Sequence, residues 1–365
     1  MRAGDASAAG ELYQRLFGPI DDEIAGFETL YLAPDGQLDL VAFTRLQVPA
    51  RGSDDGQEGP TRYWIERQVL RVVGVGRDLL SQEQPDATAG MLALGGIDYE
   101  RFPEQAQPRA GAVTAAPEPT ASSSSASSPA PVLLAMNERL RAERDGFQSL
   151  EETEAEAQEV SNYYWDKQGG QSVILNGTEA SEARLKALER PPRLLHLATH
   201  GFFLSQEQDA NAAGPATGFD RALTLSGLAL AGANLGLQGK TGPNGEDGIL
   251  YALEAQDLNL EGTELVTLSA CDTGQGRVDV SEGVYGLVRA LQIAGTRHVL
   301  MTQWALNDRA ARAFMVDFYR RWLDPDAFEH PADALRATQL EWIRSDDPVK
   351  SDPRFWAPYV LIERG

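Results

Sequence analysis

Short apolar runs alternate with amphipathic stretches along the chain, and this alternation predicts strands followed by helices. Residues 193–198 and 265–270 are short, apolar and closed by turn-forming residues, as expected of strands covered on both faces. Residues 309–323 and 331–343 place apolar side chains at helical spacing. We therefore predict an α/β protein with a mostly parallel sheet and helices on both of its faces.

The same pattern divides the chain into three parts. Residues 1–103 contain strand-like apolar runs between polar segments, which predicts a first α/β half. Residues 104–148 are predicted to form a flexible linker, rich in Ser, Pro and Ala, with a charged helix. Regular periodicity returns in residues 149–365, the predicted second half. The pattern leaves open whether the two halves share one sheet.

Charge and composition narrow the classes of partner. The net charge of −22 at pH 7 disfavours nucleic acid and anionic membranes, because binding either would need a basic surface. No apolar run approaches the roughly 20 residues of a membrane span. The chain has one cysteine, which rules out an intrachain disulfide and fits a reducing compartment. We therefore expect a cytoplasmic protein without a membrane segment.

Two of the predicted strands end at residues that are suited to nucleophilic catalysis. One strand ends at Thr199-His200-Gly201, and the other ends at the single cysteine, Cys271. If the strands are neighbours, His200 can deprotonate the Cys271 thiol. The N–H groups of Gly201 and Cys271 could then form an oxyanion hole. The alternative is that Cys271 is a buried structural cysteine and that His200 only satisfies a loop.

Two other motifs in the chain resemble ligand sites but lack part of the required pattern. His196 and His200 have the spacing of two zinc ligands on a helix, but they fall on a predicted strand with no third ligand nearby. Gly239-Lys240-Thr241 resembles the end of a phosphate-binding loop, but the leading glycine of that motif is replaced by Asn234. We therefore predict no metal and no cofactor.

Several blocks together resemble one family. Residues 195–201 (LHLATHG), 268–274 (LSACDTG), 303–304 (QW) and 356–361 (WAPYVL) resemble the CHAT family of caspase-like cysteine peptidases, which are related to separase and often joined to TPR repeats. The resemblance implies a caspase-like three-layer sandwich, with a pseudo-caspase half before the linker and a catalytic half after it. It also implies a His200–Cys271 dyad with no further orienting residue, and Gly201 as an oxyanion donor.

The resemblance also suggests where the substrate binds. Asp308 follows the strand after Cys271, and in separases an Asp at a similar position faces an Arg side chain before the cleaved bond. Asp308 would therefore favour a basic residue, with Asp272 and Asp247 as rival acidic residues near the site. The alternative is that Asp308 only caps the helix that begins near Arg309.

The expected function is cleavage of a protein substrate, as regulated proteolysis of a dedicated partner in bacterial defence or cell death. A TPR region or an activator protein is a further expected partner. Self-cleavage of the Ser- and Pro-rich part of the linker near Arg109, the basic residue available in that part, is a related possibility. The alternative function is a catalytically silent interaction or scaffold module of the same fold.

Overall fold

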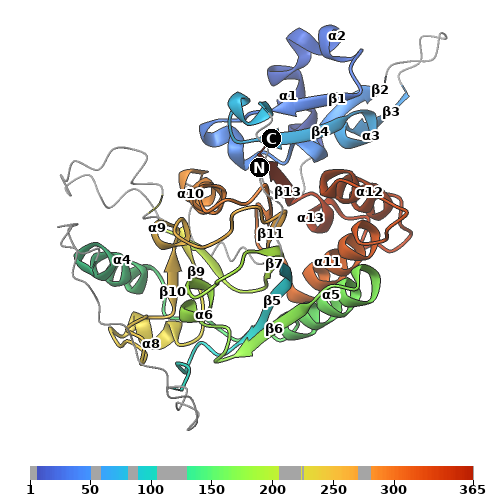
Figure 1. Ribbon diagram of the computed structural model, residues 1–365. Coiled ribbons are helices and arrows are strands. Elements are labelled where there is room, and N and C mark those ends of the chain that lie inside the picture. The colour runs from blue at the N-terminus through green and yellow to red at the C-terminus, as the bar shows by residue number, and fades with distance from the viewer. Residues whose placement is uncertain are drawn as a thin grey trace.

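A large mixed sheet organises the molecule (Figure 1). The computed structural model describes residues 6–50, 59–80, 89–104, 130–204, 223, 226–269 and 281–364. The eight strands of the sheet, in spatial order, are β1 (Thr29–Leu32), β4 (Val69–Val73), β13 (Tyr359–Glu363), β12 (His298–Thr302), β11 (Leu265–Leu268), β7 (Pro192–Leu197), β5 (Ala89–Ile97) and β6 (Ser172–Gly177). Neighbouring strands are parallel except for β12 and β13. The predicted α/β class and the mostly parallel sheet are confirmed.

The central strands are buried because both of their faces are covered. Every residue of β11 is buried, and so are five of the six residues of β7. Successive side chains on a strand point to opposite faces, so Leu194 and Leu265 enter one core, whereas Leu195 and Val266 enter the other. Two separate apolar layers therefore enclose the sheet, as in the predicted three-layer sandwich.

The helices divide between these two layers (Figure 1). One layer holds α5 (Thr153–Gln168), α11 (Asp308–Trp322) and α12 (Pro331–Ile343), whose buried residues include Val160, Phe314 and Trp342. The other layer includes α10 (Ser281–Ile293) and the short α6 (Glu182–Lys186) and α9 (Ala252–Ala255).

Smaller elements complete the fold. A three-stranded antiparallel sheet has the order β10 (Ile249–Tyr251), β9 (Ser226–Ala229), β8 (Gly201–Phe203). The remaining elements are β2 (Gln47–Ala50), β3 (Gly59–Tyr63), α1 (Ala6–Leu16), α2 (Asp21–Ile24), α3 (Trp64–Arg67), α4 (Ala130–Glu143), α8 (Ala233–Leu237), α13 (Pro353–Trp356) and four 3₁₀ turns, Gly18–Ile20, Gly36–Leu40, Phe43–Arg45 and Gly76–Leu79.

Strands from both sides of the predicted linker belong to the same sheet. β1, β4 and β5 precede the linker, and the other five strands follow it. β5 pairs with β7 on one side and with β6 on the other. The sheet is therefore continuous across the two halves, while the domain boundaries at residues 103 and 149 remain a prediction.

Candidate active site

The carboxyl ends of β7 and β11 lie side by side. The two strands are parallel, with Leu265 opposite Leu194 and Leu268 opposite Leu197. His200 follows the end of β7, and Ser269 is the last described residue after β11. Ligands of parallel sheets bind at this edge of the strands. The condition for the proposed dyad, that the two motif-bearing strands are neighbours, is thus met.

Cys271 and Asp272 lie outside the described residues. Cys271 follows Ser269 by two positions in the sequence. The His200–Cys271 dyad therefore remains a prediction that rests on neighbouring strand ends.

The His200 side chain is held on several sides. It is only 6 % exposed, and its ring lies 5.6 Å from the Phe147 ring and 5.3 Å from the Tyr99 ring, between centroids. Its Nε2 atom lies 2.6 Å from the main-chain carbonyl oxygen of Gln148. A carbonyl oxygen can only accept a hydrogen bond, so Nε2 must carry the proton. In the neutral ring Nδ1 is then the basic nitrogen, the form that a general base requires.

Gln148 and Phe147 were missed by the sequence analysis. They lie between α4 and α5, at the end of the segment predicted to be linker and charged helix. A main-chain carbonyl carries no residue-type signal, so the sequence offered no way to identify Gln148. The structure thus supplies an orienting group for His200 where none was expected.

Thr199 anchors the backbone that leads into His200. Its hydroxyl donates to the carbonyl oxygen of Ala229 and lies 3.0 Å from the Tyr99 hydroxyl. Burial raises the pKa of Tyr99 to about 12, so this phenol stays protonated at neutral pH. The adjacent bond from Ala229 N to His200 O, 2.9 Å long, begins the pairing of β8 with β9.

Gly201 occupies a position in the pairing of β8 with β9 that leaves its N–H group unpaired with β9. It lies opposite Leu228, one step beyond the Ala229–His200 bond. Hydrogen-bonded and non-hydrogen-bonded pairs alternate between antiparallel strands, so the Gly201 N–H points away from β9. That direction is compatible with the predicted role as an oxyanion donor.

A pocket of about 210 Å³ adjoins His200. Its polar lining includes Ser269, Thr302, Asp308 and Glu156, and its apolar lining includes Leu150, Ala305, Leu306 and Ala311. Asp308 and His200 therefore line the same pocket, and a contact of Asp308 with substrate stays a prediction. Burial raises the pKa of Asp308, while the nearby His200 acts in the opposite direction.

The alternative role of Asp308 as a helix cap is wrong. The N-cap of α11 is Asn307, whose side-chain oxygen accepts a hydrogen bond from Ala310 N at 2.9 Å. Asp308 is the first residue of the helix, where a carboxylate is favoured by the helix dipole but does not cap.

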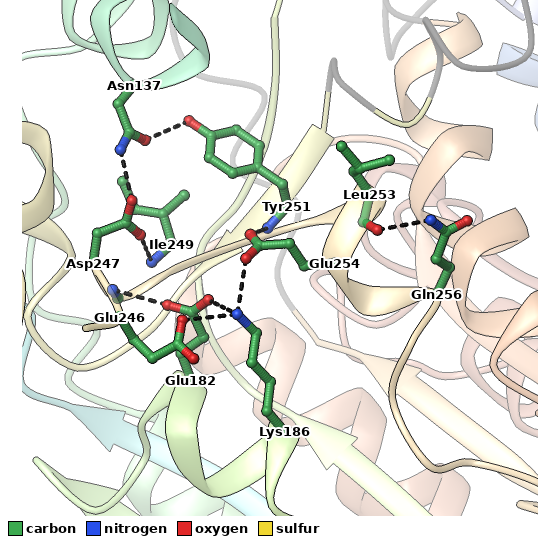
Figure 2. Close-up of polar contacts among 11 residues, drawn as sticks. Asn137, Glu182, Lys186, Glu246, Asp247, Ile249, Tyr251, Leu253, Glu254 and Gln256 are labelled. Carbon is green, nitrogen blue, oxygen red and sulfur yellow. Dashed lines mark hydrogen bonds and ion pairs between the residues drawn. The ribbon is translucent and has the colours of Figure 1, made fainter. Parts of the chain in front are cut away.

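Asp247, the other acidic residue predicted near the site, does not line this pocket. Its carboxylate accepts hydrogen bonds from Asn137 Nδ2 at 2.6 Å and from Ile249 N at 2.9 Å (Figure 2). Asn137 in turn accepts a bond from the Tyr251 hydroxyl at 2.8 Å. Asp247 therefore connects α4 to β10, on the other side of the sheet from α5 and α11.

A lysine and three glutamates form an ionic cluster beside Asp247 (Figure 2). The Lys186 ammonium lies 2.6 Å from Glu182 and 2.8 Å from both Glu246 and Glu254. Among the described residues, these three carboxylates are the group placed closely enough to hold a metal ion. The ammonium already lies between them, so the cluster has an internal counter-ion.

His196 and His200 have different partners. His196 is fully buried, with Nε2 3.0 Å from Glu156 Oε1 and its ring edge-on to Tyr319. His200 instead faces Gln148 and Phe147. The two side chains therefore contact different groups.

The fold and this strand edge define an α/β sandwich with a buried histidine at the carboxyl end of a central strand, beside a second strand that leads to a cysteine. The CHAT domain family model matches residues 6–364, and the chain belongs to this family of caspase-like proteins. The three-layer sandwich is therefore of the caspase-like type.

A curated relative was also found. The chain is 26 % identical to tetratricopeptide repeat protein 28 of Mus musculus over 197 residues, which is 52 % of this chain and 8 % of the relative. The chain thus spans a small fraction of that relative's length. In the described part of the chain, no helix is both long enough and apolar enough to cross a membrane.

Proposed function

We propose that the protein is a cysteine endopeptidase in which His200 is the general base and Cys271 the nucleophile. The observation that carries this proposal is the bond from His200 Nε2 to the Gln148 carbonyl, at a strand end beside the strand that leads to Cys271. It fixes the ring in the tautomer whose Nδ1 can take a proton. Membership of a caspase-like peptidase family supports the same chemistry.

The reaction follows from these groups. Nδ1 of His200 accepts the thiol proton of Cys271, and the thiolate attacks the carbonyl carbon of the substrate peptide. The N–H groups of Gly201 and Cys271 stabilise the oxyanion, at about 2.7–4 kcal/mol for each donor. Protonated His200 then gives its proton to the departing amine, and water hydrolyses the acyl-enzyme to regenerate the thiol.

Asp308 gives the proposed peptidase a preference. Its carboxylate adjoins His200 in the pocket, so it would favour a basic side chain immediately before the cleaved bond. Asp272, next to the nucleophile in the sequence, is a second proposed contact for substrate. We further propose cytoplasmic proteolysis of a dedicated partner, governed by a TPR region or an activator protein.

The test compares wild type with Cys271→Ala and His200→Ala, using mass spectrometry of newly formed protein termini in a cell extract. We expect wild type to create a defined set of termini, and both variants to lose at least 1,000-fold in rate, because nucleophile and base act as one unit. Circular dichroism establishes that the variants are folded.

Cleavage by Cys271→Ala at the wild-type rate would contradict the proposal. Biological activity that survives in Cys271→Ala, without cleavage by wild type, would instead support the scaffold alternative. Intact mass of the incubated wild-type protein, compared with Cys271→Ala, tests self-cleavage of the linker near Arg109.

A further inference from the structure

The pocket beside His200 is lined by a carboxylate that has no role in the proposed function. Glu156 lines this pocket together with Asp308 and Ser269, yet only 1 % of its surface is exposed. We propose that Glu156 is the main specificity residue for a lysine or arginine side chain of the substrate, with Asp308 as a second, outer carboxylate. This inference rests on the proposed peptidase function.

The hydrogen bonding of the Glu156 side chain is incomplete. Its Oε1 atom lies 3.0 Å from His196 Nε2, which is an ion pair only if that ring is protonated, and Oε1 makes no hydrogen bond among the described residues. A buried carboxylate without hydrogen bonds destabilises a folded protein unless a cation approaches it. The ammonium or guanidinium of a substrate would supply that cation and its N–H donors.

The size and lining of the pocket suit a long side chain with a charged end. Its volume of about 210 Å³ is far above the roughly 10–15 Å³ that a single water needs, so a long side chain can displace several waters. Leu150, Leu306 and Ala311 provide apolar walls along it. Lysine and arginine bury their methylene stems against apolar surface while the charged end reaches a polar partner.

The charge around the pocket is negative. Glu151, Glu152 and Glu156 all act to raise the pKa of Asp308, which shows that negative charge accumulates here. Arg312, a nearby cation, bonds Glu152 and Glu159 and does not line the pocket. A cationic side chain is therefore favoured in the pocket, and an acidic one is repelled.

Glu156 is held on a helix that is packed against the rest of the protein. Glu156 lies in the first turns of α5, next to Ala157, which is fully buried, and one turn before Val160, which is 1 % exposed. The helix packs on β5 and on α11. Specificity residues on packed helices hold their geometry better than residues on loops, so Glu156 is already in place before the substrate binds.

The experiment uses peptides that differ only in the residue before the cleaved bond, which is Arg, Lys or Leu. Glu156→Gln keeps the shape of the side chain and removes its charge. We expect it to lose about 100-fold in kcat/KM on the Arg and Lys peptides and to change the Leu peptide less than about threefold. Asp308→Asn should lose about 10-fold on the basic peptides, because its carboxylate lies nearer to solvent.

The matched control is Glu159→Gln, which removes a carboxylate of the same helix that does not line the pocket. It should leave the Arg-to-Leu ratio unchanged. An unchanged ratio in Glu156→Gln, with a folded enzyme by thermal melting, overturns the assignment of Glu156.

Binding separates this inference from the peptidase proposal. Calorimetry with the Arg peptide is performed on Cys271→Ala and on the same protein carrying Glu156→Gln. Binding by the first and at least tenfold weaker binding by the second supports Glu156, even if wild type cleaves nothing and the peptidase proposal fails. No preference of Cys271→Ala for the Arg over the Leu peptide overturns the inference.

Discussion

At the scale of single residues, the site depends on groups that the sequence signals unequally. His200 stands out because its residue type and its place after a strand both indicate catalysis. The carbonyl of Gln148, which fixes the His200 tautomer, carries no such signal. Asn307 and Asp308 are adjacent polar residues of similar size, and only the structure shows that Asn307 caps α11 while Asp308 lines the pocket.

The division of roles between these two residues is testable by urea unfolding. Asn307→Ala removes the cap of α11 and should lower the free energy of unfolding by about 1 kcal/mol. Asp308→Asn should not lower it, because a raised pKa means that folding disfavours the charged carboxylate at neutral pH. Equal losses in the two variants would contradict the assignment.

At the scale of elements, ionic clusters connect segments that are distant in sequence. Lys186 of α6 contacts Glu246, which precedes β10, and Glu254 of α9. Burial and the neighbouring Glu254 raise the pKa of Glu182, although Lys186 opposes this shift. The cluster therefore depends on the single ammonium of Lys186 to balance its carboxylates.

Lys186→Met should lower the free energy of unfolding by about 2 kcal/mol at pH 8. This loss is smaller than that expected when one partner of a fully buried ion pair is removed, because the Lys186 side chain is 29 % exposed. Glu182 has a raised pKa in the folded state, so its protonated form favours folding. That contribution is present at low pH and is lost as pH rises through the folded-state pKa. With a folded-state pKa of about 9, Glu182 becomes ionised only near that pH, so the effect of Lys186→Met should be larger at pH 10 than at pH 8.

Urea unfolding at both pH values measures this difference. The control is Lys240→Met, since Lys240 is an exposed lysine. Equal destabilisation by Lys186→Met at pH 8 and pH 10 would show that Lys186 does not neutralise the Glu182 carboxylate.

At the scale of the whole molecule, the segment before the linker is joined to the rest through shared strands and through polar contacts, which include a cluster around Arg71. Arg71 of β4 bonds Glu363 of β13 at 3.0 Å, Asp333 of α12 at 2.8 Å and His330 Nδ1 at 2.9 Å. The His330 ring packs edge-on against His298 of β12, with centroids 4.9 Å apart. β4 is thereby fixed to the strands of the second half.

This cluster predicts acid sensitivity. Burial lowers the pKa of His298 to about 3 and that of His330 to about 4, with Arg71 adding to both shifts and Asp333 opposing the second. Because both values lie below the usual 6.5, the stability that these residues contribute is present above pH 6.5. It is lost as pH falls toward 4.

Urea midpoints measured from pH 7 to pH 4 test this prediction. His330→Gln, which cannot gain a proton, should flatten the decline relative to wild type. Glu363, whose pKa is raised by burial, contributes stability in the opposite direction and is unchanged in both proteins. An identical pH dependence in wild type and His330→Gln would contradict the role of the histidine pair.

The sequence by itself determined the α/β class, the central strands and the two motif-bearing strand ends. These features follow from local apolar runs and turn residues, which do not need the rest of the chain to be recognised. The place of Asp308 near the site came only from the resemblance to separases, with a helix cap as the alternative. The sequence left open whether the two halves share a sheet, because strand pairing depends on contacts between distant residues.

Only the tertiary structure decided which groups surround His200. Glu156 looks like any acidic residue in the first turn of a helix, and its role in the pocket becomes visible only when α5 packs beside β5 and α11. Asp247, an equally plausible acidic candidate in the sequence, is instead bonded to Asn137. The difference arises because burial and hydrogen bonding, rather than residue type, decide where a carboxylate lies and what it can bind.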